Sequence, residues 1–487
     1  MLGPVLDNVV FHVDRLIGDG LERVVRAHHH RRLHKRGWGR ALDPMEGIWA
    51  TGSPPPRSGN SIDVLIDGEE AFPAIVDAIR GATSHVHFAG WYMNPDFRLV
   101  RTRETTVVFR DLLEEVARRI PVRVLMWAGA PIPLKRYQTS RPDVRARGSE
   151  LCHGSRVHLA LDAYERPLHC HHEKIVVVDD EIAFVGGIEP TIAGGDRYDG
   201  QHHRPHGERG WHDATTRLRG PVVADVAEHF LMRWKEVTGE DLTPPRRPEP
   251  VGEVEAQIVR TVPEKIYRSL PHGDFSIVES YTRALRSARR LIYFENQFLW
   301  SQHIVDLLAD KLRDPPTDDF RVVLVLPSRP TTGMDDTLGQ LGILLEADQA
   351  DRLLVCSLYA HAGGEIEQVY VHAKIGIVDD KWLTVGSANL NNHSLFNDTE
   401  MNVVTCDPGL ARATRLRLWA EHLERDISEV EGDTTQLVDE VWRPTAKAQL
   451  RLREQGLPFT HRLVQLPHAS KRAKRLLGPI QGLMVDG

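Results

Sequence analysis

Two stretches of the sequence repeat one pattern, HEKIVVVDDEIAFVGGIE at 172–189 and HAKIGIVDDKWLTVGSAN at 372–389. Each holds a His, a Lys two positions on and an Asp after a further apolar run: His172, Lys174 and Asp179, then His372, Lys374 and Asp379. Residues two apart on an extended strand face the same side, so each His and its Lys are expected to project together. The apolar runs IVVV and IGIV are typical of strands buried in a sheet.

The segments around the two motifs also follow one another in the same order. Each half has a helix-then-strand pattern, two further strand-like runs and a closing helix: 70–93, 122–127, 156–162 and 224–237 in the first, and 275–300, 321–327, 352–359 and 413–424 in the second. Strands alternating with helices predict the α/β class. The duplication predicts two similar α/β sandwich halves, each a mixed sheet flanked by helices, packed about a pseudo-two-fold axis with one shared active site.

Pro-rich stretches at 51–60 and 241–250 punctuate the chain and indicate domain boundaries. We predict four parts: a helical, basic N-terminal extension at 1–60, a first half at 61–245, a second half at 251–425 and a C-terminal extension at 426–487. The basic run HHHRRLHKR at 28–36 fits docking on anionic lipid, metal binding or packing on the body. The stretch 468–487 leaves membrane docking and packing equally open.

Composition bounds the class of protein. With 41% hydrophobic and 26% charged residues the chain has the balance of a soluble globular protein. Its net charge of -7 lacks the positive field that drives nucleic-acid binding, so we expect no nucleic-acid partner. The four cysteines are scattered singly, which favours free thiols over disulfides or a zinc site. Without an apolar run of ~20 residues or a signal peptide, we expect a cytoplasmic protein with no transmembrane segment and, at most, peripheral membrane contact.

The residue types of the two motifs point to phosphate chemistry. Two imidazoles offer a nucleophile and a proton donor near neutral pH, and two ammonium groups can hold the non-bridging oxygens of a phosphate. A single His-x-Lys pair is a weak signal, but here both copies are followed at equal spacing by a glycine turn, Gly186-Gly187 and Gly386-Ser387. The set needs no metal ion, and we expect no cofactor.

Over about residues 60–425 the sequence resembles the phospholipase D superfamily. The resemblance is carried by the two motifs, by WHD at 211–213, by YFENQF at 293–298 and by VHAKIGIVDDKWLTVGSANLNNHSLFNDTEMNV at 371–403. The GGIE, WHD and ENQ elements look closest to the eukaryotic-type phospholipases D. The resemblance implies a metal-independent, two-step displacement through a phosphohistidine.

The resemblance also implies roles for individual residues. His172 is the expected nucleophile, and His372 is expected to protonate the leaving alcohol and then activate the incoming water or alcohol. Glu400 is expected to orient His172, and Asp213 to orient His372, each from the opposite half. Such an acid fixes the imidazole tautomer and stabilises the imidazolium.

Supporting residues follow from the same resemblance. Asn389 is expected to contact the phosphate together with Lys174 and Lys374, and Ser387 is a candidate supporting residue. The position that corresponds to Asn389 in the first half holds Glu189, whose carboxylate cannot donate a hydrogen bond when ionised.

Asp179 and Asp379 belong to the motif, but each ends a buried run just before a turn. We expect these carboxylates to accept hydrogen bonds from turn backbone rather than to contact substrate. Trp91, Trp127 and Trp300 lie at or just after predicted strands and are expected mainly in the core, with a site wall as the alternative.

His202, His203 and His206 share a Gly-rich loop between the first motif and WHD. Metal ligation favours side chains fixed on rigid elements, so we expect a loop at the mouth of the site instead.

The leading hypothesis is therefore a phospholipase D that hydrolyses glycerophospholipids at a membrane surface to phosphatidate, or transfers the phosphatidyl group to an alcohol. Three alternatives remain: a cardiolipin-synthase-like phosphatidyltransferase, a nuclease or other phosphodiesterase, and an inactive lipid-binding scaffold. The negative charge disfavours the nuclease, and the two intact His-x-Lys pairs disfavour the scaffold.

Overall fold

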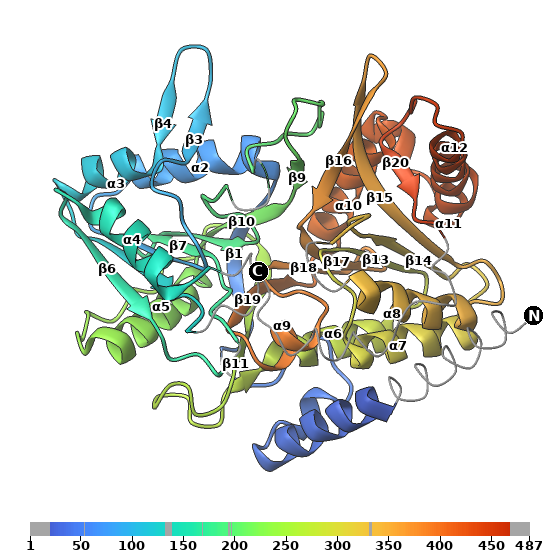
Figure 1. Ribbon diagram of the computed structural model, residues 1–487. Helices are drawn as coiled ribbons and strands as arrows, with labels where there is room; N and C mark the ends of the chain where they lie inside the picture. Colours follow the sequence, from blue (N-terminus) through green and yellow to red (C-terminus); the bar gives the residue numbers. More distant parts are fainter. Residues whose placement is uncertain are drawn as a thin grey trace, which may run out of the picture.

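The structure is a computed structural model that describes residues 20–467 except 53, 132–138, 168, 193–194, 196 and 331–333. The stretch 468–487, for which membrane docking was one interpretation, lies outside the described residues. Figure 1 shows the first half of the chain in blue and green beside the second half in yellow and red.

The first half is a mixed sheet with the strand order β6-β5-β2-β7-β8-β10-β1. Strands β2, β5 and β6 are parallel, and the other neighbours are antiparallel. Its elements are β1 (Arg57–Ile66), α2 (Asp67–Gly81), β2 (Val86–Gly90), β3 (Arg98–Arg101), β4 (Thr106–Val108), α3 (Phe109–Ala117), β5 (Val122–Trp127), α4 (Arg141–Cys152), β6 (Val157–Asp162), β7 (Ile175–Val178), β8 (Ile182–Gly186), β9 (Gly210–His212), β10 (Ala214–Arg219) and α5 (Val223–Thr238).

The second half repeats this topology with the order β15-β14-β13-β17-β18-β19-β11 and the same parallel and antiparallel senses. Its elements are β11 (Val254–Val262), β12 (Asp274–Phe275), α6 (Ser276–Ser287), β13 (Leu291–Asn296), α7 (Gln302–Arg313), β14 (Arg321–Val325), α8 (Met334–Ala347), β15 (Leu353–Ala362), β16 (Glu365–Val371), β17 (Lys374–Val378), β18 (Trp382–Gly386), α9 (Asn392–Phe396), β19 (Glu400–Thr405) and α10 (Pro408–Leu423). The α/β class and the duplicated halves expected from the sequence are confirmed.

The remaining elements precede the first half or follow the second half in the chain. They are a helix over 20–35, η1 (Gly39–Ala41), η2 (Ile427–Val430), α11 (Thr434–Leu437), η3 (Val438–Trp442), α12 (Arg443–Glu454) and β20 (Leu463–Gln465). The helix over 20–35 packs on the second half, where buried Arg32 contacts Glu264 at 2.9 Å and donates to the backbone oxygen of Phe396. Of the interpretations of the basic run at 28–36, packing on the body is the one that the structure shows.

The two sheets are also hydrogen-bonded to each other. Strands β1 and β11 pair at Arg57↔Ala256 and Asn60↔Val254, so eighteen of the described strands form one hydrogen-bonded network. The apolar core also crosses the junction, because Val177 and Val185 of the first half share a buried cluster with Val403 of the second.

The local sequence accounts for the two motif strands and for the turns that follow them. All residues of β7 and β17 are buried, and apart from Lys374 at the start of β17 these strands are uninterrupted apolar runs. Each strand then ends in two residues with left-handed backbone, Asp179 and Asp180 or Asp379 and Asp380, with φ between 51° and 59°. Asp tolerates this conformation better than most residues, so the paired aspartates allow the tight turn into β8 or β18.

Candidate active site

Backbone hydrogen bonds between the halves bring the site together. The N–H of His172 donates to the carbonyl of Thr399 (2.9 Å), and the N–H of His372 donates to the carbonyl of His212 (2.8 Å). The second contact continues the parallel pairing of β9 with β16, in which His212 lies opposite Val371. Each catalytic candidate His is thereby fixed beside the residue that precedes the acid from the other half.

His172 lies against Glu400. Its Nδ1 is 3.0 and 3.1 Å from the two carboxylate oxygens, and the Glu400 side chain is fully buried. Two hydroxyls also donate to this carboxylate, Ser394 at 2.5 Å and Ser387 at 2.5 Å. With Nδ1–H held by Glu400, the Nε2 lone pair of neutral His172 is available as a nucleophile.

His372 lies against Asp213 in the same way, with Nδ1 2.6 Å from Oδ2. Burial raises the pKa of Asp213 to about 6, although nearby Lys374 and Arg197 act to lower it. Burial first, and then Lys374, Arg197 and Lys174, lower the pKa of His372 well below its usual value. Above pH 6 the pair therefore consists of an imidazole without charge and a carboxylate. Lys174 of the first motif is thus close enough for its charge to act on the pKa of His372 in the second.

The two lysines are buried beside the histidines. Each Nζ donates to the backbone carbonyl of its own His, at 2.6 Å for Lys174, and Lys374 also donates to Gln297 at 3.3 Å. Burial lowers the pKa of Lys374 to about 7, and Lys174 and Arg197 lower it further while Asp213 acts to raise it. Buried ammonium groups of this kind are stabilised by an anion, such as a phosphate, between them.

Glu189 and Asn389 occupy equivalent positions but differ in contacts. Glu189 Oε2 accepts hydrogen bonds from the backbone N–H groups of Trp91 (3.0 Å) and Tyr92 (3.2 Å), and Oε1 lies 3.7 Å from Lys174 Nζ. It anchors the end of β2. The amide of Asn389 is fully buried, and neither its oxygen nor its nitrogen has a hydrogen-bond partner among the described residues. That amide nitrogen is thus available to donate to a ligand.

Asp179 and Asp379 lie at the opposite ends of β7 and β17 from the lysines. Asp179 accepts from the backbone N–H groups of residues 83–85 at 2.7 to 2.9 Å, and Asp379 accepts from those of residues 289–291 at 2.7 to 2.8 Å. Both carboxylates thus tie a hairpin turn to the segment before a neighbouring strand. The role is a supporting one, as the sequence predicts, but the donors belong to that other segment and not to the turn that contains the aspartate.

Two residues near the site have no assigned role from sequence. The Arg197 guanidinium lies 3.8 Å from the Trp211 ring centre, and that ring lies edge-on to His372 with centroids 4.7 Å apart. Trp211 belongs to the WHD element, so a sequence signal existed. Arg197 lies in an aperiodic Gly-rich loop, where only its charge marks it.

The same loop corrects one expectation. His202 and His206 are exposed, but the His203 side chain is fully buried and contacts Asp199 (3.0 Å) and Glu421 (3.1 Å). The interpretation of all three histidines as lining the site mouth is wrong for His203. Loop composition gave no sign of this, because the partner Glu421 is more than 200 residues away in the chain.

The three tryptophans are buried next to the site. Trp91 stacks on Trp127 with ring centroids 6.0 Å apart, and its ring lies 6.4 Å from that of His172. The ring of Trp300 lies next to that of His393, with ring centroids 5.9 Å apart. They are core residues, and Trp91 also forms a wall beside His172.

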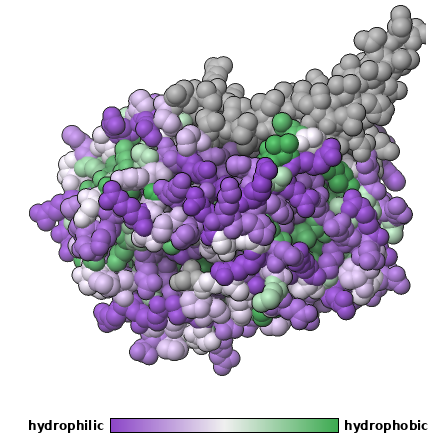
Figure 2. Space-filling model, turned by 90° about the horizontal axis from the view of Figure 1, so that it is seen from below, coloured by the Kyte–Doolittle hydropathy of each residue, from purple (hydrophilic) through white to green (hydrophobic). Residues whose placement is uncertain are grey.

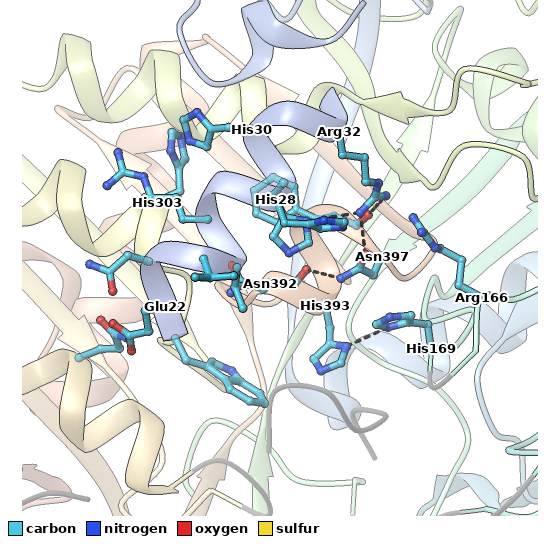
Figure 3. A pocket seen from close by; sticks show the side chains of 18 of the residues that line it. Glu22, His28, His30, Arg32, Arg166, His169, His303, Asn392, His393 and Asn397 are labelled. Carbon is cyan, nitrogen blue, oxygen red and sulfur yellow. Dashed lines mark hydrogen bonds between the residues drawn. The ribbon is translucent and has the colours of Figure 1, made fainter. Parts of the chain in front are cut away.

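A cavity of about 460 Å³ opens between the helix over 20–35, α9 and the segment with Arg166, Pro167 and His169. Figure 3 shows His169 and His393 facing each other at its edge, where their Nδ1 atoms are 3.0 Å apart. His169 precedes His172 by three residues in the chain and His393 follows Asn389 by four, but none of the catalytic candidates is among the residues that line this cavity.

Comparisons with known proteins bear on the class of protein to which the chain is similar. The family described as "Cardiolipin synthase, PLD-like domain" matches residues 281–423. The chain is 25% identical to phospholipase D A of Dictyostelium discoideum, over 76% of this chain and 36% of that protein. It is 24% identical to phospholipase D zeta 2 of Arabidopsis thaliana, over 81% of this chain and 57% of that protein. It is 26% identical to the major cardiolipin synthase of Bacillus subtilis, over 72% and 67%.

The chain therefore spans only part of the first two relatives, 36% and 57% of their lengths. Among solved structures, phosphatidylserine synthase of Haemophilus influenzae superposes with a TM-score of 0.52 at 13% identity, covering 81% of this chain and 95% of that one. This likeness concerns the fold.

The duplicated α/β fold and the paired His, Lys and acid residues define a site for phosphodiester chemistry. The comparisons support membership of the phospholipase D superfamily.

Proposed function

We propose that this protein is a phospholipase D, which cleaves the headgroup phosphodiester of a glycerophospholipid through a phosphohistidine and releases phosphatidate. The observation that carries the proposal is the pairing across the halves. Two histidines, each oriented by a buried acid of the opposite half, flank two buried lysines.

The first displacement uses both histidines. Nε2 of His172 attacks phosphorus, the bond from phosphorus to the headgroup oxygen breaks, and protonated His372 donates its Nε2 proton to that oxygen. Lys174, Lys374 and the amide of Asn389 stabilise the negative charge on the non-bridging oxygens.

The second displacement reverses these roles. A water or alcohol oxygen gives its proton to His372 and attacks phosphorus, and the electrons of the P–N bond return to His172. Neutral His372, which its burial and then the neighbouring buried cations favour in the substrate-free site, is the form that this step requires. The substrate's own negative charge offsets those cations and lets His372 become protonated for the first step.

A phospholipid is supported as the substrate by two observations. The relatives include proteins named phospholipase D and cardiolipin synthase. The net charge of -7 disfavours a polyanionic substrate such as DNA.

The membrane would be approached from outside the bilayer. Among the described residues, no helix has both the length and the apolar character to cross a membrane. On the face seen in Figure 2, hydrophilic residues predominate and the hydrophobic areas are small and separate.

The test uses vesicles of phosphatidylcholine or phosphatidylethanolamine with dilute ethanol. The proposal expects phosphatidylethanol beside phosphatidate, because any small alcohol that replaces the attacking water can resolve the phosphoenzyme. Single-stranded DNA should stay uncut, and His172→Ala should abolish lipid turnover. DNA cleavage without lipid turnover would overturn the lipid assignment. Vesicle binding with neither substrate consumed would support a lipid-binding scaffold instead.

The second candidate is a cardiolipin-synthase-like phosphatidyltransferase, which the family match over 281–423 favours. Here the alcohol that resolves the intermediate is a second phosphatidylglycerol. Vesicles of phosphatidylglycerol would then yield cardiolipin and glycerol in equal amounts. Phosphatidate and glycerol without cardiolipin would exclude the transferase and favour hydrolysis.

A further inference from the structure

A compact group of four ionisable side chains lies behind the His372–Asp213 pair. Asp67 begins α2, His203 lies in the Gly-rich loop, His212 ends β9 and Glu421 is in α10, so both halves contribute. Each of the four side chains is at most 1% exposed. None of them has a role in the proposed reaction.

The facing atoms of these side chains are spaced like the ligands of a small ion. His212 Nδ1 lies 3.1 Å from Asp67 Oδ1 and 3.2 Å from Glu421 Oε1. His203 Nε2 lies 3.4 Å from Asp67 Oδ2 and 3.1 Å from Glu421 Oε1. A tetrahedral metal ion with bonds of ~2.0–2.2 Å separates neighbouring ligand atoms by about 3.3–3.6 Å. The observed spacing is close to that range.

Two of the facing atoms lack a hydrogen-bond partner. His212 Nδ1 and Asp67 Oδ2 are completely buried, and neither makes a hydrogen bond to the described residues. His212 Nδ1 is close to Asp67 Oδ1, and Asp67 Oδ2 is close to His203 Nε2, both within 3.4 Å, but the directions required for a hydrogen bond are not met. Buried polar atoms normally have a partner, so these two atoms indicate that a ligand belongs between them.

The outer nitrogens of both histidines are held by carboxylates. His203 Nδ1 lies 3.0 Å from Asp199 Oδ2, and His212 Nε2 lies 2.7 Å from Glu295 Oε2. Metal-binding histidines commonly donate their second N–H to a carboxylate, which fixes the tautomer that presents a lone pair to the ion. Both histidines have this arrangement.

We propose that Asp67, His203, His212 and Glu421 bind one divalent transition-metal ion, with Zn²⁺ as the best fit. Two imidazoles and two carboxylates in a closed tetrahedron are ligands typical of zinc. Two carboxylate charges balance the ion while both imidazoles stay neutral.

The ion would hold the two halves together behind the catalytic candidates. The Asp213 N–H donates to Asp67 Oδ1 (2.9 Å), and the carbonyl of His212 accepts the N–H of His372. All four positions are filled by protein, so the ion has no open position for substrate and stabilises the fold. The proposal does not depend on which phosphodiester is cleaved.

The test measures metal content in the full chain, expressed without a polyhistidine tag in zinc-supplemented medium. Inductively coupled plasma mass spectrometry should find about one zinc per chain that persists through dialysis, because the site is closed. Asp199→Asn, which alters only the carboxylate behind His203, should weaken zinc affinity by about 10–100-fold. The matched control is His206→Ala, an exposed histidine of the same loop, which should keep the full zinc content.

A second measurement does not depend on any variant folding. The wild-type chain grown with Co²⁺ in place of Zn²⁺ should show the intense visible bands of tetrahedral cobalt. Folded wild-type chain that carries no metal, and whose melting temperature does not respond to Zn²⁺ supplied during refolding, would overturn the proposal. The four groups would then be an ion-pair network with a proton on each imidazole. Equal zinc content in wild type and in folded His203→Ala would also overturn it.

Discussion

Replacing His372 with Ala should trap the covalent intermediate on His172. The imidazole held 2.6 Å from Asp213 is the expected proton donor in the first step and acceptor in the second, so its loss impairs both with a natural lipid. A general acid-base group is typically worth ~10²–10⁴ in rate, or about 2.7–5.4 kcal/mol of activation free energy. With a nitrophenyl phosphodiester the leaving group needs no proton, so the first step escapes this cost. The second step retains it, because water must still be deprotonated.

The assay follows nitrophenol release after rapid mixing. His372→Ala should give a burst of one nitrophenol per chain, followed by turnover slower than wild type by ~10²–10⁴-fold. The trapped chain should carry an acid-labile, base-stable adduct that peptide mapping assigns to His172. The control is His361→Ala. The His361 imidazole lies near the end of β15 and contacts Glu424, so its loss should leave the protein behaving as wild type.

Two outcomes would refute this reasoning. Accumulation of the adduct on His372 in a His172→Ala chain, with none in His372→Ala, would reverse the two roles. Steady turnover without a burst and without an adduct in either variant would refute the covalent mechanism.

Three further predictions concern charge and support. Because the pKa of Lys374 is lowered to about 7, its ammonium is present below pH 7 and lost above it. The value of kcat/KM should therefore fall as pH rises through about 7. In Lys374→Arg this fall at high pH should disappear. Brief addition of excess EDTA to the assay should leave the rate unchanged, since lysines and Asn389 supply the charge stabilisation, whereas rapid loss restored by a divalent ion would indicate a catalytic metal. Asp179→Ala and Asp379→Ala each strip three backbone N–H groups of an acceptor, so chemical denaturation should show a loss of about 1–3 kcal/mol with kcat preserved; a loss of activity in a stable variant would mean direct participation.

Sequence predicted the parts of this molecule that depend on local order. The apolar runs after Lys174 and Lys374 have the length and composition of buried strands, and the structure has β7 and β17 there. The equal spacing of the two motifs also predicted the duplicated fold, because equivalent segments fold into equivalent elements.

Contacts without periodicity were not predictable in this way. Arg197 and His203 lie in a loop, where neither alternation nor helical spacing marks a buried face. His203 is buried only because Asp67 and Glu421 meet it from segments far apart in the chain. The edge pairing of Arg57 with Ala256 likewise depends on how the halves meet, which no local pattern records.

The structure also gives a physical reason why the two histidines can have different roles although the two halves have the same fold. The second-motif turn has Ser387, whose hydroxyl donates to Glu400, so the acid behind His172 is held by two hydroxyls as well as by the imidazole. The first-motif turn has Gly187 at the same position, and a Cβ there would lie 2.2 Å from Asp213 Oδ1. Asp213 therefore needs the glycine, and it lacks a matching hydroxyl.

This difference suits the division of labour that we propose. Burial raises the pKa of Asp213 to about 6, closer to that of an imidazole than a carboxyl group usually is. A proton can then arrive at and leave the His372–Asp213 pair near neutral pH, as a general acid and base requires. Glu400, fixed by three donors, instead holds His172 in one tautomer with Nε2 free, as a nucleophile requires. The two histidines thus differ through the residues that contact their acids rather than through the His-x-Lys pairs.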